Sequence, residues 1–315
     1  MMVFALPDET YNNFRIPGLV LTKKETLLAC CECRRGGGDD WAEIDLVVRR
    51  STDEGENWTQ PLLIPGDGNT MNNPMLTVCG DTILFLYCLN YKRLFICESH
   101  DDGSSFSAPR EIEGVFESGG FFYNVAAIGP GHGIVKDGVI LLPVWFAYNK
   151  EDEKEHRPSF IATIYSKDAG KTWHLGEVLD HSELVNPSEC ALVVWQDQVL
   201  ISIRNENAAR RRAFAVSPNG YGNWSKPMLY DNMVDPICQG SMDHTADAIY
   251  HINCDDDAAR VNLSVKVSRD GFKTYEKRLI DEQGGYADLA VGKRLYVLYE
   301  KNFGRDGLFF LCLDK

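Results

Sequence analysis

The 315-residue sequence lacks several features that would assign it to a common functional class. It contains no apolar run near the roughly eighteen residues that a membrane-spanning helix requires, so no membrane span is predicted. Its seven histidines show no HExxH or other metal-ligand spacing. Neither a P-loop nor a dinucleotide-binding glycine motif occurs. The sequence therefore predicts neither a bound metal nor a cofactor.

Positive charge is also scarce, because 32 lysines and arginines stand against 46 aspartates and glutamates, for a formal charge of −14. A field of this sign disfavours nucleic acids and anionic membrane surfaces as partners. The segment MMVFALPDETYNNF lacks the basic region and long apolar run of a signal peptide. We therefore expect a cytoplasmic protein with reduced cysteines, in which Cys30, Cys31 and Cys33 are small apolar residues of a buried strand. The sequence indicates no oligomeric state.

A short motif with serine, aspartate, glycine and an aromatic residue at offsets 0, 2, 4 and 7 does occur, in the stretch STDEGENW. Five copies of varying fidelity begin at Ser51, Ser99, Ser166, Ser217 and Ser268. Between them the chain has short runs rich in Val, Ile, Leu, Phe and Tyr, bounded by Gly, Asp or Asn, as strands are. A repeat near fifty residues with four strands per unit is the size of a propeller blade. The sequence predicts an all-β, six-bladed β-propeller, five blades marked by the motif, as a single domain over 1–315.

The motif itself has a structural explanation that requires no chemistry. Aspartate and serine side chains accept backbone N–H bonds in tight turns, and glycine adopts a backbone conformation that other residues resist. The aromatic side chain would pack the turn onto its own blade. The last two copies depart from the pattern, since Asn219 replaces the aspartate and Gly271 comes one position early. We therefore expect the motif to fasten a hairpin rather than to catalyse a reaction.

The segment FRIPG at 14–18, followed by these Asp boxes in order, resembles the sialidase (neuraminidase) family, glycoside hydrolase family thirty-three. The resemblance extends over nearly the whole chain. It implies an exo-α-sialidase that releases terminal α-linked sialic acid from glycans without a cofactor. A sialylated glycan is the implied partner.

In that family three arginines bind the carboxylate of sialic acid. The resemblance places them at Arg15 in FRIPG, Arg204 in LISIRNEN and Arg260 in ARVNLSVKVS. A guanidinium is always charged and binds a carboxylate through two parallel hydrogen bonds, which suits this task. The neighbouring run Arg210–Arg212 is interpreted as solvated surface charge.

The resemblance also implies the nucleophile and its base, Tyr286 in GGYADLAV and Glu189 in NPSECALVV. Sialidases are the exception among glycosidases in using a tyrosine nucleophile. The anomeric carbon of sialic acid carries a carboxylate, which would repel an anionic nucleophile but not a neutral phenol. A carboxylate within hydrogen-bond reach would then remove the phenol proton during attack.

The glycine-rich segment RRGGGDDWAEIDL resembles the loop that carries the family's acid/base aspartate. We prefer Asp40 for this role and keep Asp39 open. Arg34 or Arg35 is a candidate contact to the polar rim of the sugar. The segment TMNNPML offers Met71 and Asn73 as further contacts.

Three other functions remain compatible with these residues. The same propeller could act on another nonulosonic or keto-acid sugar, or transfer sialic acid as a trans-sialidase. A non-catalytic sugar-binding propeller is the alternative of another class.

In GPGHGI, His132 is interpreted as bracing a loop. We expect small, soluble oligosaccharides to be preferred substrates.

Overall fold

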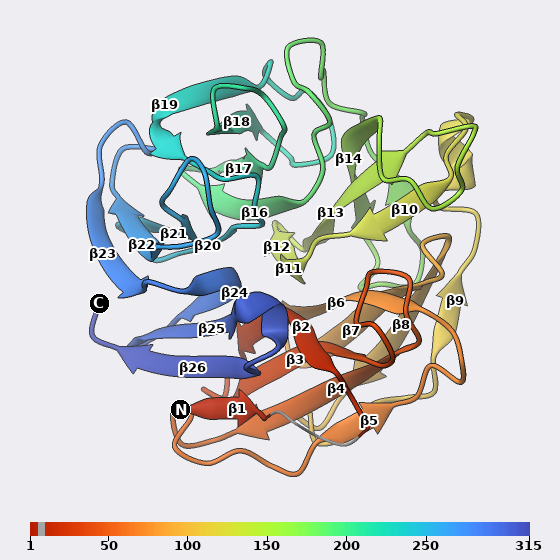
Figure 1. Ribbon diagram of the computed structural model, residues 1–315, viewed down its shortest axis with the longest axis vertical. Coiled ribbons are helices and arrows are strands. Elements are labelled where there is room, and N and C mark those ends of the chain that lie inside the picture. The colour runs from red at the N-terminus through yellow and green to blue at the C-terminus, as the bar shows by residue number, and fades with distance from the viewer. Residues whose placement is uncertain (6–9) are drawn as a thin grey trace. The chain divides into compact units, whose positions relative to one another are not determined.

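A computed structural model describes residues 1–5 and 10–315. The described residues form strands β1 to β26 and two short 3₁₀ turns, η1 (Glu117–Gly119) and η2 (Asn302–Gly304), with no α-helix (Figure 1). The strands assemble into six sheets of four or five strands. This confirms the predicted all-β class and the number of blades. Among the same residues, no helix has the length and apolar character that a membrane crossing requires.

The chain divides into two compact units. Unit 1 comprises Met1–Glu113, Pro130–His132 and Tyr286–Lys315, and unit 2 comprises Gly114–Gly129 and Gly133–Gly285. Each unit holds three of the six sheets. The single domain over 1–315 stays a prediction.

Unit 1 contains two sheets in which consecutive strands pair as antiparallel neighbours, and a third that combines both ends of the described chain. The first sheet is β2 (Asn13–Leu21), β3 (Leu27–Arg34), β4 (Ile44–Ser51) and β5 (Leu62–Ile64). The second is β6 (Met71–Cys79), β7 (Thr82–Leu89), β8 (Arg93–Ser99) and β9 (Arg110–Ile112), with β11 (Gly131–His132) parallel to β6. The third is β24 (Gly284–Val291), β25 (Leu295–Lys301), β26 (Leu308–Leu313) and β1 (Met2–Phe4).

Strand β1 completes this third sheet by pairing antiparallel to β26, with Met2 opposite Phe309 (Figure 1). The sheet carries no copy of the repeated motif. It is therefore the unmarked sixth blade that the sequence predicts.

Unit 2 repeats the same strand arrangement three times. Its first sheet is β10 (Val125–Ile128), β12 (Ile134–Lys136), β13 (Val139–Ala147), β14 (Ser159–Ser166) and β15 (His174–Leu175). The second is β16 (Cys190–Trp195), β17 (Gln198–Ile203), β18 (Arg211–Ser217) and β19 (Met228–Val234). The third is β20 (Ser241–His244), β21 (Ile249–Cys254), β22 (Leu263–Ser268) and β23 (Glu276–Asp281).

Each motif serine is the last residue of the strand that pairs with the final, outermost strand of its sheet, so the motif forms the turn toward that strand. In the first copy, Ser51 Oγ donates to Asp53 Oδ1 at 2.7 Å and accepts the Gly55 N–H at 3.0 Å. Asp53 Oδ1 also accepts the Asn57 N–H at 2.9 Å, and Trp58 Nε1 donates to the Gly55 carbonyl at 3.1 Å. These bonds confirm that the motif fastens a hairpin.

The two irregular copies form similar hydrogen bonds with different residues. Asn219 Oδ1 accepts the N–H groups of Tyr221 and Gly222, as an aspartate would. In the last copy Phe272 stands where glycine is expected, donates its N–H to Ser268 Oγ at 2.8 Å and has φ +64°. Its side chain is fully buried in the core of unit 2, which holds a non-glycine residue in this costly conformation.

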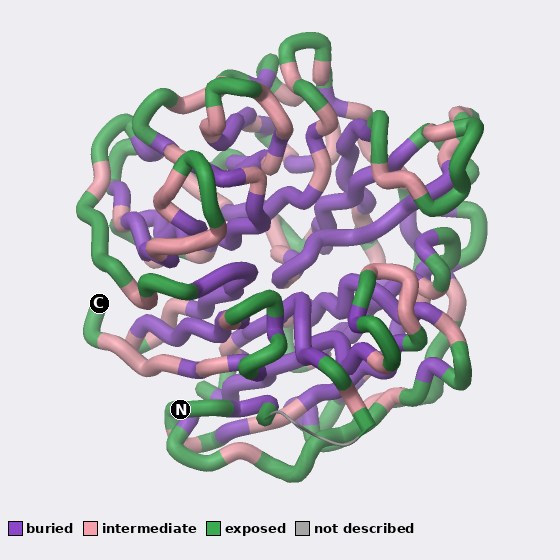
Figure 2. The backbone as a smooth tube through the Cα atoms, in the orientation of Figure 1, coloured by how far each residue is buried: buried purple, intermediate pink, exposed green. Residues whose placement is uncertain are grey.

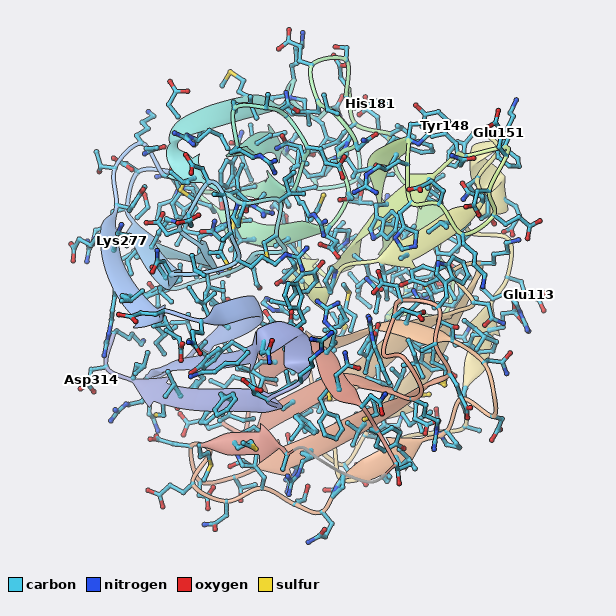
Figure 3. All side chains as sticks on the ribbon, viewed as in Figure 1. Glu113, Tyr148, Glu151, His181, Lys277 and Asp314 are labelled. Atoms are coloured by element: carbon cyan, nitrogen blue, oxygen red, sulfur yellow. The ribbon has the colours of Figure 1, made fainter. Side chains whose placement is uncertain are left out.

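The cores lie between neighbouring sheets within each unit, and burial follows the strands while loops are exposed (Figure 2). Cys30, Cys31 and Cys33 are at most 1% exposed, which confirms their interpretation as small apolar residues of a buried strand. Charged side chains such as Glu151 and Lys277 project outward from the ribbon (Figure 3). The buried charged residues include Arg15, Glu32, Arg34 and Glu300, which lie at the candidate site.

Candidate active site

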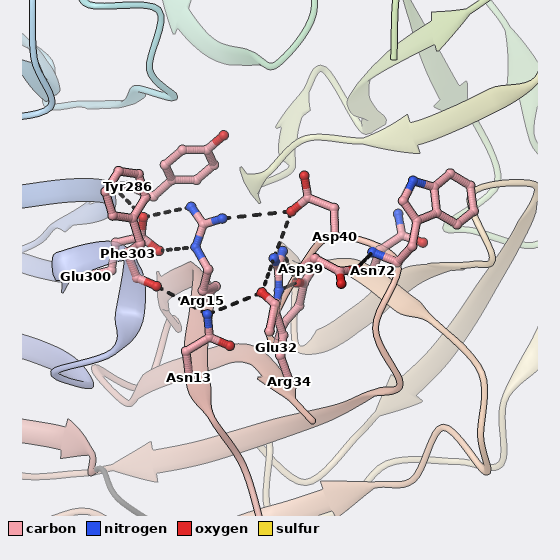
Figure 4. Close-up of polar contacts among 12 residues, drawn as sticks. Asn13, Arg15, Glu32, Arg34, Asp39, Asp40, Asn72, Tyr286, Glu300 and Phe303 are labelled. Carbon is pink, nitrogen blue, oxygen red and sulfur yellow. Dashed lines mark hydrogen bonds and ion pairs between the residues drawn. The ribbon is translucent and has the colours of Figure 1, made fainter. Parts of the chain in front are cut away.

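The predicted site residues fall into two groups, one in each unit. Unit 1 brings together Arg15, Arg34, Asp40 and Tyr286 (Figure 4). Unit 2 contains the second group, which consists of Glu189, Arg204 and Arg260.

Arg15 lies in an irregular stretch of β2, where the pairing with β3 shifts between Arg15 and Gly18. Ile16 has φ +59° in this bulge, a conformation that a β-branched residue rarely adopts. The bulge interrupts the regular alternation of side chains beside Arg15. The side chain of Arg15 is 11% exposed, so its charge needs partners within the protein.

Glu300 on β25 supplies the main partner of Arg15. Arg15 Nε donates to Glu300 Oε2 at 3.0 Å and Nη2 donates to Oε1 at 2.9 Å, a two-pronged ion pair. Burial alone would lower the pKa of Arg15, but the Glu300 carboxylate outweighs it and raises that pKa well above its usual value. Glu300 was not predicted from the sequence, although a single glutamate in the apolar run LYVLYE was a detectable signal.

Tyr286 on β24 shares this carboxylate. Its backbone N–H donates to Glu300 Oε1 at 3.3 Å, and the Arg15 guanidinium carbon lies 4.9 Å from the centre of its ring. A guanidinium at this distance from an aromatic face forms a cation–π contact, which orients the ring. Glu300 thus fixes Arg15 and the backbone of Tyr286 together.

Asp40 faces the same cation from the other side (Figure 4). Its Oδ1 accepts from Arg34 Nη1 at 2.7 Å and lies 3.8 Å from Arg15 Nη1. Arg34 and Glu32 are two residues apart on β3, so both side chains lie on the same face of the sheet. Arg34 Nε donates to Glu32 Oε2 at 2.7 Å. Burial raises the pKa of Glu32, and Arg34 partly offsets this. The Asp40 side chain is 48% exposed, which leaves it reachable by substrate and water.

Asp39 has a different environment from Asp40. Its Oδ1 accepts the Trp41 N–H at 2.8 Å, which uses the carboxylate to close its own turn. The Trp41 ring lies 4.7 Å from that of Tyr91 and anchors the loop. Gly38 is also held, because its carbonyl accepts from Arg34 Nη1 at 3.2 Å. The contacts therefore support Asp40 over Asp39 as the acid/base candidate, within a loop tied at several points.

The other predicted contacts of unit 1 have structural surroundings. Met71 is 3% exposed and belongs to the core cluster between the first two sheets, so its predicted sugar contact gains no support. Asn73 has φ +54° and donates its N–H to Glu32 Oε1 at 2.8 Å. The role of Asn73 in binding stays a prediction.

His132 lies on β11 and braces strands, whereas the sequence predicted that it braces a loop. Its Nδ1 lies 2.9 Å from Asp288 Oδ1, and Asp288 Oδ2 accepts the Leu19 N–H at 2.8 Å. Asp288 thereby connects three strands, β24, β11 and β2. It stands two residues after Tyr286 and supports the strand that carries this tyrosine.

In unit 2, Glu189 and Arg204 form a short ion pair between the start of β16 and the end of β17. Their backbones continue the ladder, since the Arg204 N–H donates to the Glu189 carbonyl at 3.1 Å. Arg260 Nη2 donates to the Ile237 carbonyl at 3.4 Å. Burial alone would raise the pKa of the Cys238 thiol. A hydrogen bond with Cys254 and the charges of Arg260 and Arg204 outweigh this effect and lower the pKa of Cys238.

One interpretation from the sequence is wrong. Arg212 is not a solvated surface charge: it is 0% exposed, and Nη1 pairs with Asp235 Oδ2 at 2.9 Å. Arg210 and Arg211 are partly exposed. In β18 the two neighbouring arginines point to opposite faces, and only Arg212 enters the core.

No group of three or more His, Cys, Asp or Glu side chains among residues 1–5 and 10–315 is arranged to hold a metal ion. The arrangement instead offers guanidinium groups for an anion, a half-exposed carboxyl group and an oriented phenol. These are the components of acid/base and nucleophilic chemistry on an anionic substrate.

Comparison with known proteins gives concordant results. The model of the BNR repeat-like domain family matches residues 25–296. A sialidase of Bacteroides fragilis is 25% identical over 344 residues, covering 94% of this chain and 61% of that protein. Sialidase-3 of Rattus norvegicus is 28% identical over 295 residues, covering 82% of this chain and 69% of that protein. The chain therefore spans about three fifths to two thirds of the length of these relatives.

Solved structures show the same fold. A Hadza microbial sialidase superposes with a TM-score of 0.85 at 23% identity, covering 99% of this chain and 68% of that one. Trypanosoma rangeli sialidase in complex with sialic acid gives a TM-score of 0.77 at 20% identity, covering 95% and 54%. These likenesses confirm the predicted six-bladed β-propeller.

Proposed function

This chain belongs to the BNR repeat-like domain family, and on that premise we propose that it is an exo-α-sialidase. It would hydrolyse terminal α-linked sialic acid from glycans with retention of configuration. The observation that carries the proposal is the cluster of unit 1, in which Arg15 contacts the ring of Tyr286 and lies 3.8 Å from Asp40. A carboxylate binder, a nucleophile and an acid/base group thus occur together.

In the proposed reaction Asp40 protonates the leaving oxygen while Tyr286 attacks the anomeric carbon. Water activated by Asp40 then cleaves the bond to Tyr286. Asp40 suits both steps, because two guanidinium groups orient its carboxylate while nearly half of its side chain is exposed.

The resemblance to sialidases supplies the roles of the unit 2 residues. Glu189 is the proposed base for Tyr286, and Arg204 and Arg260 are the proposed second and third ligands of the substrate carboxylate. The ion pair between Glu189 and Arg204 supports this, since it fixes a base and a carboxylate binder relative to each other.

The first test is release of the fluorophore from an aryl α-sialoside by the wild type and by Tyr286→Phe. We expect turnover by the wild type and a fall in kcat of roughly a thousandfold or more in the variant. Tyr296→Phe is the control, because Tyr296 is a buried tyrosine of the adjacent strand and lies in the core cluster. Unchanged activity of Tyr286→Phe would refute the assignment of the nucleophile.

Three outcomes would redirect the functional assignment. No turnover by a folded wild type, with turnover of an α-glycoside of another keto-acid sugar, would change the substrate and keep the mechanism. Formation of a new sialoside when lactose is added would identify a trans-sialidase. Binding of sialic acid without any turnover would favour the non-catalytic sugar-binding propeller.

A further inference from the structure

Arg212 has no direct role in the proposed chemistry, yet its partners lead to Arg260. Its Nε donates to Ser202 Oγ at 2.7 Å. Its Nη1 donates to both Asp235 Oδ2 at 2.9 Å and the Cys238 carbonyl at 2.8 Å. One fully buried guanidinium therefore ties strand β17 to the segment 235–240, which connects β19 to β20.

This β19–β20 connection is strained at the residue that contacts Arg260. Ile237 has φ +63°, a genuine outlier for a β-branched side chain. Its carbonyl accepts the hydrogen bond from Arg260 Nη2. The Cys238 N–H donates to Asp235 Oδ1 at 2.9 Å, so the contacts of Arg212 bracket the strained residue. The surrounding bonds, rather than local preference, set the direction of the Ile237 carbonyl.

Only an arginine fits the position of Arg212. Its planar group presents donors in a fixed fork, which here meets a hydroxyl, a carboxylate and a carbonyl. Ser202 Oγ accepts the hydrogen bond from Arg212 Nε and also lies 2.9 Å from His251 Nε2, so the network continues to β21. Burial, followed by the charge of Arg212, holds the pKa of His251 well below its usual value.

We propose that Arg212 is a positioning residue for Arg260. It holds the β19–β20 connection in the conformation in which the Ile237 carbonyl orients the Arg260 guanidinium for the substrate carboxylate. A long side chain that loses such an anchor populates many rotamers and must be ordered again at each binding event. This inference rests on the proposed function and deepens it, because it names a residue that determines recognition of the carboxylate.

The test compares two ligands by isothermal titration calorimetry. One is the sialic acid analogue 2,3-didehydro-2-deoxy-N-acetylneuraminic acid, and the other is its methyl ester, which lacks the carboxylate charge. For Arg212→Met we expect affinity for the acid to fall by about tenfold, the worth of one charge-assisted hydrogen bond, while the ester changes little. Combining it with Arg260→Ala should add nothing to the loss in Arg260→Ala alone, because the effect runs through Arg260.

A second variant keeps the test decisive if Arg212→Met does not fold. Ser202→Ala retains Arg212 but removes the acceptor of its Nε, one of the contacts that hold it in place, so we expect a smaller loss with the same selectivity for the acid. Thr163→Val is the control, since it removes a buried hydrogen bond to the Gly220 carbonyl at 2.8 Å in the same unit. It should lower Tm and preserve the ratio of the two affinities.

Two results would count against these ideas, and they are distinguishable. If Ser202→Ala, and Arg212→Met where folded, discriminate acid from ester as the wild type does, the positioning role is overturned. If the wild type binds neither ligand, the proposed function itself is contradicted, and the inference that rests on it falls too.

Discussion

Replacing Glu300 by glutamine would remove one negative charge from the centre of unit 1 without changing the shape of the side chain. Glu300 is 0% exposed and accepts two hydrogen bonds from Arg15 and one from the Tyr286 N–H. A glutamine can accept at one oxygen only, and its NH₂ group would face an Arg15 N–H donor. The change therefore leaves a buried guanidinium with one poor contact and less compensating charge.

The expected cost follows from these contacts. Removing one partner of a buried ion pair costs about 3–5 kcal/mol. Arg15 retains Asp40 at 3.8 Å and the Tyr286 ring, so the lower end, about 3 kcal/mol, applies to Glu300→Gln. With an unfolding entropy of about 2.1 cal/mol/K per residue, such a loss lowers Tm by about 5 °C for cooperative unfolding of the whole chain.

Differential scanning calorimetry measures this shift, and steady-state kinetics measures its consequence for activity. Because Glu300 fixes both Arg15 and Tyr286, KM should rise and kcat should fall together. Glu276→Gln is the matched control, since its ion pair with Arg269 at 3.1 Å is solvent-exposed and should change Tm by less than about 1 °C. A Glu300→Gln variant with the Tm and KM of the wild type would refute the reasoning.

Two further predictions concern carboxylates. Asp40→Asn should reduce turnover of sialyllactose by roughly 10²–10⁴-fold, but should affect turnover of an aryl sialoside with a good leaving group far less. If turnover collapses in Asp39→Asn instead, the acid/base role belongs to Asp39. The pKa values of Asp53, Asp101 and Asp168 are lowered to about 2, mainly because each accepts hydrogen bonds from the residue four positions later. Their stabilising effect is present above the unfolded pKa and lost as pH falls through about 2, so Tm should drop from pH 4 to pH 2. The triple Asp→Asn variant should show a shallower drop, and an equal drop in both proteins would contradict this origin.

The blades were predictable because their signal is local. Each motif copy determines its own turn from residues within seven positions, and the strands around it alternate or run apolar. The irregular last copy shows the limit of such local information. Nothing in the sequence near Gly271 reveals that Phe272 takes the left-handed conformation, because burial of its ring in the core of unit 2 holds it there.

The roles of the site residues came from the resemblance to sialidases rather than from a local pattern. Arg15, Asp40 and Tyr286 were assigned in this way and lie together in unit 1, while their roles stay predictions. Glu300 was missed because its partner Arg15 lies 285 positions away. Arg212 was misassigned because three consecutive arginines do not reveal which one faces the core. Those two assignments depend on tertiary packing, which no local pattern contains.

The pairing of β1 with β26 has a consequence for how the protein forms. The sheets of β2–β5, β16–β19 and β20–β23 each come from one continuous stretch and can form as soon as that stretch emerges from the ribosome. The sheet of β24, β25, β26 and β1 needs residues 2–4 and 308–313 at once, so β1 cannot pair until β26 has been made. Such a distant contact is slow to form. Until β1 pairs with β26, the edges of both strands stay open to pairing with other chains. The nascent protein is therefore most vulnerable to aggregation at these two strands.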